Sequence, residues 1–132
     1  MAKLLWKPSQ ERIENSNMYR FMNVINDKYN QNFSEFAPLH QWSIENIADF
    51  WETMWEFADI IHSKPYDEII DDDSKMPGAH WFSGARLNFA ENLLRYRDAR
   101  DALVFRSETG HEERLTYGQL YRRVAGLASA MR

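Results

Sequence analysis

Four side chains with helical spacing could form a metal site. The acidic and imidazole residues that follow one another at intervals of four, three and three positions are Glu52, Glu56, Asp59 and His62. On one helix they would share a face, but di-metal bundles also draw matching ligands from facing helices. No other predicted helix carries a Glu-x-x-His motif. We therefore favour the solvent-exposed face of an amphipathic helix and assign no metal ligand.

Other polar residues lack the spacing that catalysis or cation binding requires. The run Asp71–Asp73 could hold a hard cation, but it lacks the alternating spacing and the following Gly and Glu of a calcium loop. Ser83 does not lie in a Gly-x-Ser-x-Gly elbow. The histidines, which sit in polar or loop settings without an evident nucleophile partner, are His40, His62, His80 and His111. We expect surface or packing roles and assign no catalytic residue.

Phosphate binding needs a glycine-rich loop whose backbone N–H groups converge on the anion. The five glycines are scattered singly at positions 78, 84, 110, 118 and 126. The sequence therefore contains no phosphate loop, and we assign no cofactor-binding residue.

Bulk composition excludes several classes of partner. The 132 residues suffice for one domain with a core. The net charge is −4, and the densest basic groups (Arg95/Arg97/Arg100 and Arg122-Arg123) are short, so neither nucleic acid nor an anionic membrane is an expected partner. The chain has no cysteine, no apolar stretch of the roughly 20 residues that a membrane span requires, and no signal pattern after Met1. We expect a cytoplasmic protein.

Hydrophobic periodicity predicts mainly helices in the first two thirds of the chain. Residues 8–29 read as a helix in two pieces that restarts at Asn15–Asn17. A connector over 30–41 precedes a helix that Ser43 caps, with an apolar stripe over 44–61 and a stop at Pro65. Residues 63–84 read as loop, and a short helix follows over 87–96.

The pattern changes at Ala102. Residues 102–115 read as a β-hairpin, and Thr116 with Gln119 gives the capping-box spacing for a final helix. No stop signal precedes Arg132, so we expect the chain to be cut from a longer one. The predicted fold class is mostly α with a small β-hairpin (α+β).

One segment resembles a known family. Its signature, Trp-Phe-x-Gly-x-x-Leu-Asn-x-Ala-x-Asn, appears as Trp81-Phe82, Gly84, Leu87-Asn88, Ala90 and Asn92. This is similar to the opening segment of the acetyl-CoA-synthetase-like branch of the adenylate-forming (AMP-binding) superfamily. Further stretches resemble the acetoacetate–CoA ligase family of that branch, namely Leu5–Ser9, Leu39–Ser43, Phe50-Trp51, Trp55–Phe57, Met76–Ala79 and Ala90–Leu94. Leu115–Leu120 and Val124–Ala128 resemble the strand-to-helix step that opens the family's large domain.

The resemblance implies a fragment of an α/β enzyme in two parts. Residues 1–98 would be its amino-terminal helical region, and residues 99–132 the first hairpin and helix of a truncated AMP-binding domain. The full-length enzyme would use ATP, Mg²⁺ and CoA to convert acetoacetate into acetoacetyl-CoA, AMP and pyrophosphate. The family's phosphate loop, ribose-binding Asp, hinge residue and late catalytic Lys do not occur here, so the chain alone is expected to be structural and inactive.

The signature residues have structural roles in this interpretation. The Trp81-Phe82 pair would anchor the amino-terminal helices onto the main domain, Gly84 would supply a special backbone conformation, and Asn88 and Asn92 would tie loop backbone. Direct contact of Arg86 with nucleotide or CoA is the functional alternative.

Partners follow from the same interpretation. The expected partner is the remainder of the parent synthetase. The exposed face of residues 117–131 and the hairpin edges predict self-association of the isolated chain. Two alternatives remain, a freestanding helical interaction module without enzyme activity and a metal-binding helical bundle.

Overall fold

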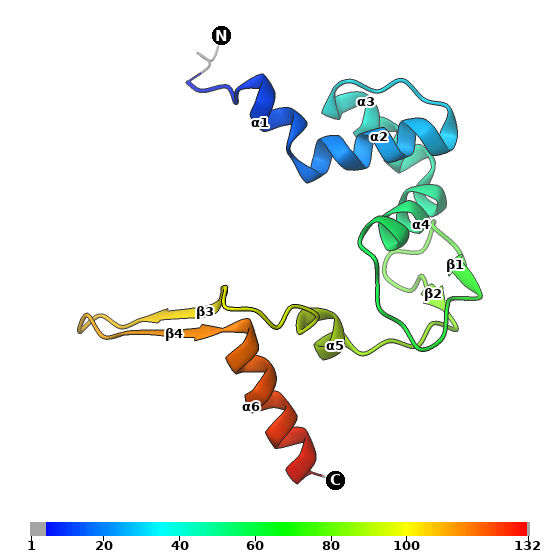
Figure 1. The fold of residues 1–132 in the computed structure, drawn as a ribbon. Coiled ribbons are helices and arrows are strands. Elements are labelled where there is room, and N and C mark those ends of the chain that lie inside the picture. The colour runs from blue at the N-terminus through cyan, green and yellow to red at the C-terminus, as the bar shows by residue number, and fades with distance from the viewer. Residues whose placement is uncertain (1–4, 132) are drawn as a thin grey trace. The chain divides into compact units, whose positions relative to one another are not determined.

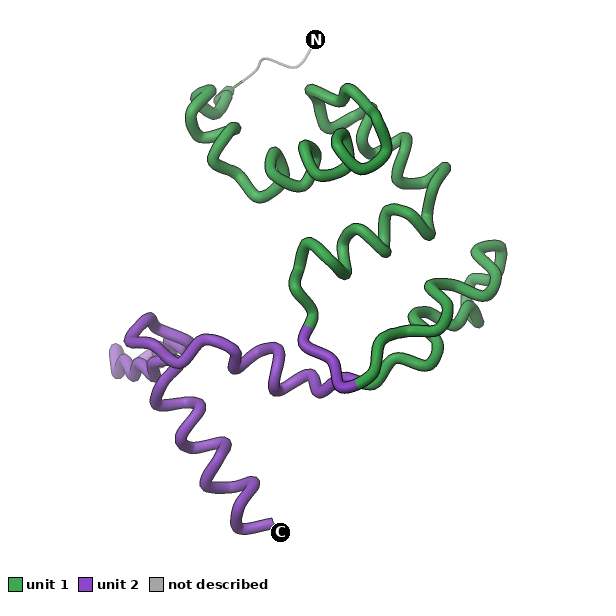
Figure 2. Tube along the Cα trace, turned by 45° about the vertical axis from the view of Figure 1, so that its right-hand side comes forward, with its two compact units in different colours: residues 1–60, 64–86 green, residues 61–63, 87–132 purple. Residues whose placement is uncertain are grey.

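The structure, a computed structural model, describes residues 5–131, which form two compact units (Figures 1 and 2). Unit 1 holds the described residues up to Ile60 together with Lys64–Arg86. Unit 2 holds Ile61–Ser63 and the described residues from Leu87 onward. Met1 and Arg132, on which the expectations about a signal pattern and a cut chain rest, lie outside the described residues. No helix in the described part is long and apolar enough to cross a membrane.

Unit 1 begins with two helices, α1 (Gln10–Glu14) and α2 (Asn17–Tyr29). The Ser9 hydroxyl accepts a hydrogen bond from the Arg12 N–H at 3.3 Å, and Ser16 accepts one from Tyr19 at 3.1 Å. Each serine satisfies one of the N–H groups that a helix start leaves unpaired. The predicted two-piece helix with a restart at the Asn15–Asn17 cluster is confirmed.

Two helices, α3 (Phe36–Glu45) and α4 (Ile47–Phe57), occupy the region where we predicted a connector over 30–41 and a helix over 44–61. The connector prediction was therefore wrong from Phe36 onward, and the predicted helix begins at Ile47 and ends at Phe57. Ser43 is not a cap, because it lies inside α3 and donates its hydroxyl hydrogen to the His40 carbonyl at 2.8 Å. Asn46 separates the two helices, because its backbone is non-helical. Its side-chain amide donates a hydrogen bond to the Trp42 carbonyl at 3.0 Å. Pro38 fits because the first turn of a helix does not use its N–H groups.

The core of unit 1 lies where α2, α3 and α4 meet. Its buried apolar side chains are Phe21, Met22, Ile25, Leu39 and Trp42. Phe21 makes edge-to-face contacts with Phe50 and Phe57 of α4, with ring centroids 5.5 Å and 5.2 Å apart. Burial of each large apolar side chain stabilises the unit by roughly 1.5–3 kcal/mol. This packing holds α4 in place for the contacts described below.

A hairpin missing from the prediction completes unit 1. Strands β1 (Glu68–Ile70) and β2 (Trp81–Ser83) pair antiparallel, with Ile70 opposite Trp81. Each strand has three residues, which is too short for a period-two pattern to stand out, and the expectation of a loop over 63–84 was therefore wrong in this part.

Unit 2 contains α5 (Phe89–Leu93), the antiparallel pair β3 (Asp101–Arg106) and β4 (Glu112–Thr116), and α6 (Tyr117–Ala130). The predicted hairpin and capping box are confirmed: the Thr116 hydroxyl accepts from the Gln119 N–H at 3.2 Å, and the Gln119 side chain accepts from the Thr116 N–H at 2.9 Å. The fold is mostly α with small β-hairpins, as predicted, although the helix expected over 87–96 is shorter.

Candidate functional site

The Trp-Phe pair of the signature anchors the β1–β2 hairpin to α4. Neighbouring residues of a strand normally point to opposite faces, but Phe82 has a left-handed backbone with φ of 48°. Both rings therefore reach the same helix. Trp81 lies edge-on to Trp51 with centroids 5.7 Å apart, and Phe82 lies 4.8 Å from Trp55. These contacts lie within unit 1 and join its hairpin to α4. The predicted anchoring of the helices onto the main domain stays a prediction.

Gly84 occupies a backbone conformation that other residues avoid, as predicted. Its φ is 83°, and a Cβ built there would clash with the Asp67 Oδ2. The Lys64 ammonium holds that carboxylate at 2.7 Å. Because the Asp67 side chain can turn away, the left-handed φ is the stronger reason for glycine.

The two asparagines of the signature tie backbone within unit 2. Asn92 Oδ1 accepts from the Ile61 N–H at 2.9 Å, and its Nδ2 donates to the Ile61 carbonyl at 2.8 Å. Asn88 caps α5 by accepting from the Glu91 N–H at 3.2 Å. Asn92 therefore has the predicted role of binding loop backbone, whereas Asn88 binds the backbone of the helix α5.

Arg86 lies at the end of the hairpin of unit 1. Its backbone forms an isolated antiparallel bridge with Lys64, with N···O distances of 3.0 Å and 3.2 Å. The contact of Arg86 with a nucleotide or CoA, considered from the sequence, remains a hypothesis.

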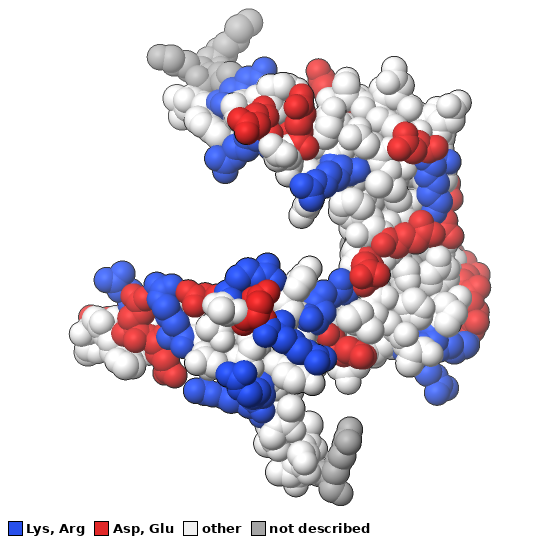
Figure 3. Space-filling view, viewed as in Figure 1, with Lys and Arg blue, Asp and Glu red and all other residues white. Residues whose placement is uncertain are grey.

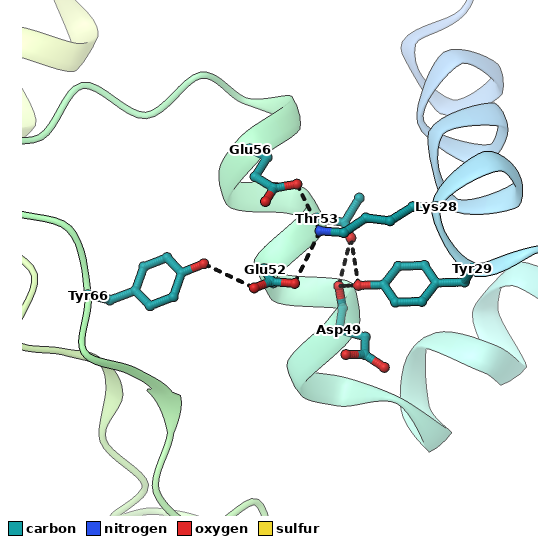
Figure 4. Close-up of polar contacts among 7 residues, drawn as sticks. All are labelled: Lys28, Tyr29, Asp49, Glu52, Thr53, Glu56 and Tyr66. Atoms are coloured by element: carbon teal, nitrogen blue, oxygen red, sulfur yellow. Dashed lines mark hydrogen bonds and ion pairs between the residues drawn. The ribbon is translucent and has the colours of Figure 1, made fainter.

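Two of the four candidate metal ligands bind a lysine instead. Figure 4 shows Lys28 of α2 reaching both Glu52, at 3.1 Å, and Glu56, at 2.9 Å, on α4. Partial burial of Lys28 opposes its charge, but the hydrogen bonds that its ammonium donates to Glu56 and Glu52 outweigh this effect and raise the pKa of Lys28 above its ordinary value. Tyr66 adds a long hydrogen bond of 3.4 Å to Glu52. These carboxylates therefore join α2 to α4.

The other two candidates do not lie on the helix. We expected one helical face to present all four, but α4 ends at Phe57, and Asp59 has a left-handed backbone with φ of 49°. His62 belongs to unit 2. Among residues 5–131, no group of three or more His, Cys, Asp or Glu side chains is arranged to hold a metal ion.

The Asp71–Asp73 run organises the loop between β1 and β2. Asp71 accepts hydrogen bonds from the His80 main-chain N–H at 2.8 Å and its carboxylate lies 3.1 Å from the His80 Nδ1. The His80 main chain and side chain thereby hold the pKa of Asp71 well below its usual range. Asp72 accepts from the hydroxyl and N–H of Ser74, which lowers its pKa too. These oxygens already have donors from the loop itself.

The remaining candidates lie in separate elements. Ser83 is in β2, where its carbonyl accepts from the Asp67 N–H at 2.8 Å. His40 lies against Phe36, with ring centroids 5.7 Å apart. His111 lies near Phe105, with centroids 6.4 Å apart. These contacts are packing contacts, as expected.

The glycines do not form a phosphate cradle. Gly78, Gly84 and Gly110 each have a positive φ, and they lie in different turns. A cradle requires several successive N–H groups that point at one anion. These three glycines therefore do not form such a cradle together, and we assign no chemical step to the described residues.

Both units instead present apolar surfaces. In unit 1, a groove of about 450 Å³ lies between α4 and the β1–β2 loop, where Trp51, Trp81 and Met76 are 41%, 44% and 97% exposed. In unit 2, α5, β3 and α6 line an apolar groove of about 350 Å³. Figure 3 shows uncharged atoms between the scattered charges of the visible face. Grouped exposed apolar side chains indicate surfaces for binding other protein.

Comparisons with known proteins agree with the signature. A model of the family described as "Acetyl-coenzyme A synthetase N-terminus" matches residues 36–93. An acetoacetyl-CoA synthetase of Danio rerio is 36% identical over 99% of this chain and 20% of its own length. A malonamoyl-CoA synthetase of Penicillium aethiopicum is 36% identical over 98% of this chain and 19% of its own length. The solved acetoacetyl-CoA synthetase from Streptomyces lividans aligns with a TM-score of 0.84 and 34% identity, covering 99% of this chain and 21% of that one.

The class defined by the fold and the signature is thus the amino-terminal region of acyl-CoA synthetases, enzymes of the ligase type. Within that class, the chain is related along its whole length to acetoacetyl-CoA synthetases. It spans about a fifth of the length of these relatives.

Proposed function

We propose that the chain is the structural amino-terminal part of an AMP-forming synthetase that converts acetoacetate, ATP and CoA into acetoacetyl-CoA, AMP and pyrophosphate. The observation that carries the proposal is the match of 99% of the chain to one fifth of a solved acetoacetyl-CoA synthetase. In this proposal the remaining four fifths of the enzyme bind ATP, Mg²⁺ and CoA, and the chain alone is inactive.

The exposed surfaces support a docking role. Phe105 in β3, Leu127 in α6 and Trp81 in β2 are 56%, 62% and 44% exposed. Large apolar side chains exposed in groups are costly in water, because burial of each Å² of apolar surface is worth roughly 25 cal/mol. A catalytic body that covers these side chains in the full-length enzyme would explain why they are apolar yet exposed in this chain.

A chimera tests the proposal directly. Residues 1–132 replace the aligned segment of the Streptomyces lividans enzyme, and AMP release is measured with acetoacetate, ATP and CoA. We expect activity from the chimera and none from the chain alone or from the truncated body. A folded but inactive chimera, or turnover by the chain alone, contradicts the proposal.

The acyl substrate is tested with a full-length natural enzyme that carries this segment, because the chimera takes about four fifths of its length from the Streptomyces lividans enzyme. One relative is named for malonamoyl-CoA, so malonamate serves as the competing acid. We propose acetoacetate because acetoacetyl-CoA synthetases are the relatives in both the sequence and the structure comparison. If the full-length natural enzyme turned over acetoacetate and malonamate at equal rates, that result would contradict the choice of acetoacetate.

A freestanding interaction module is the second candidate. The buried core of unit 1, which includes Ile25 at 0% and Leu39 at 2% exposure, favours it because such a core can support independent folding. A stable monomer that captures a full-length synthetase from solution would support this candidate over the first.

A further inference from the structure

The two strands of the unit 2 hairpin differ in chemistry. In β3, Leu103, Val104 and Phe105 follow one another, so both faces of the strand are apolar, and these side chains are 54%, 55% and 56% exposed. In β4, Glu112, Glu113 and Arg114 place charge on both faces. Strands that are apolar on both faces are typical of sheet interiors with cover on each side, whereas charged strands are typical of sheet edges.

The register of the β3–β4 pair shows which backbone groups of β3 do not bond to β4 and can pair with a further strand. Ser107 donates its N–H to the His111 carbonyl at 2.8 Å, and the register continues with Phe105 opposite Glu113 and Leu103 opposite Leu115. Because bonded and non-bonded pairs alternate in an antiparallel ladder, the N–H and C=O groups of Val104 and Arg106 point away from β4. By the same alternation, those of Glu112 and Arg114 point to the outer edge of β4.

We propose that the free edge of β3 receives an extended strand from the catalytic body of the synthetase, while β4 stays the outer edge of the combined sheet. This inference rests on the proposed function, since the body is the part of the relatives that the chain does not span. Addition of a strand satisfies the backbone groups of Val104 and Arg106, and side-chain contacts on both faces supply specificity.

Two observations favour the body over a second copy of this chain. First, pairing β3 with another β3 satisfies the edge but leaves the side chains of Leu103, Val104 and Phe105 about half exposed, whereas a larger partner can cover both faces of the strand. Second, β4 already carries its own protection. Arg114 is held by Asp101 at 2.6 Å and by Glu112 at 2.7 Å, and charged side chains on an edge strand discourage further pairing.

Hydrogen exchange tests the assignment residue by residue. Amide exchange is compared between the chimera described above and the isolated chain at low concentration. We expect the amides of Val104 and Arg106 to exchange on the order of 100-fold more slowly in the chimera, since sheet interiors open rarely. The amides of Glu112 and Arg114 should exchange equally fast in both proteins.

Substitutions provide an independent measurement. Val104→Pro removes the outward N–H, and Val104→Ala keeps it while shortening the side chain. Glu112→Pro removes an outward N–H at the first residue of β4, where proline is tolerated. We expect Val104→Pro to lose more chimera activity and thermal stability than Val104→Ala, and Glu112→Pro to lose little of either.

The outcomes separate the two proposals. An active chimera whose Val104 and Arg106 amides exchange fast, or whose Glu112 and Arg114 amides are protected instead, overturns the edge assignment alone. Protection of Val104 and Arg106 in the isolated chain that grows with concentration makes a second copy the occupant and also overturns it. A chimera that folds without activity contradicts the proposed function and the inference that rests on it.

Discussion

The side-chain amide of Asn92 brackets the peptide of Ile61, accepting from its N–H at 2.9 Å and donating to its C=O at 2.8 Å. The pair copies the two-bond contact between neighbouring strands, with one side chain in place of a strand. It fixes the short stretch Ile61–Ser63 within unit 2.

Asn92→Ala should destabilise unit 2 by about 1–3 kcal/mol, because it leaves two backbone groups without partners. Urea unfolding followed by far-UV circular dichroism measures this change. Tryptophan fluorescence would not, because all five tryptophans lie at or before residue 81 and report on unit 1. Gln41→Ala, which removes an exposed bond to Glu45 in α3, is the control and should cost less than about 0.5 kcal/mol. Equal effects would argue against the bracket.

Gly84→Ala should destabilise unit 1 by about 1–2 kcal/mol through the left-handed backbone, with a further steric cost at Asp67. The double variant Gly84→Ala/Asp67→Ala should recover only the steric part. Tryptophan fluorescence during urea unfolding measures both. Full recovery in the double variant would show that the φ of 83° is not what requires glycine.

Acid should weaken the β1–β2 loop through Asp71. Its pKa is lower in the folded chain than the unfolded value of about 3.9, so its contribution to stability is complete above that value and is lost as the pH falls below about 4. Asp71→Asn, which cannot ionise, should show a shallower loss of urea midpoint between pH 5 and pH 2. Parallel pH profiles of the two proteins would rule out this role.

Lys28→Met should destabilise unit 1 by about 0.5–1 kcal/mol, since it leaves Glu52 and Glu56 as like charges one helical turn apart. Adding Glu56→Gln to Lys28→Met should restore part of the lost stability. Added salt should reduce the stability difference between Lys28→Met and the unmodified chain, because it screens the repulsion between the two carboxylates. Lys64→Met, at the exposed pair with Asp67, is the matched control. A double-mutant cycle without coupling would contradict the link between α2 and α4.

The isolated chain should self-associate through its exposed apolar side chains. Light scattering over a concentration series should show a rising mass, and Leu127→Lys or Phe105→Lys should lower it without lowering the unfolding midpoint. Val24→Lys on α2, where exposure is 38% against 62% for Leu127, is the control. A constant monomer mass at high concentration would overturn this expectation.

Features encoded by a few neighbouring residues were predictable. The Thr116 cap depends on Gln119, three positions away, and formed as expected. The second helix restarts at Ser16, within the predicted Asn15–Asn17 cluster. The break at Asn46 was hidden because the apolar stripe continues from α3 into α4. Local periodicity contains no signal for a change of helix direction, which is set by packing against α2.

Contacts between distant residues in the site were not predictable from spacing. Lys28 reaches Glu52 across 24 positions and Glu56 across 28, so no local spacing indicates that these residues are joined. Asn92 and Ile61 are 31 positions apart. The signature identified Asn92 as a backbone-binding residue, but its partner could be identified only from the folded chain.

The division into units has a consequence for dissection of the molecule. The polypeptide passes from unit 1 to unit 2 after Ile60, returns at Lys64 and leaves again after Arg86. A single cut after Arg86 would therefore release unit 1 with Ile61–Ser63 still attached, whereas no single cut of the backbone releases unit 2 whole. A protease that nicks the chain near residue 62 would leave the first sixty residues attached only by non-covalent packing on their neighbours in unit 1. A nicked sample should therefore migrate as intact protein under native conditions and as two pieces once denatured.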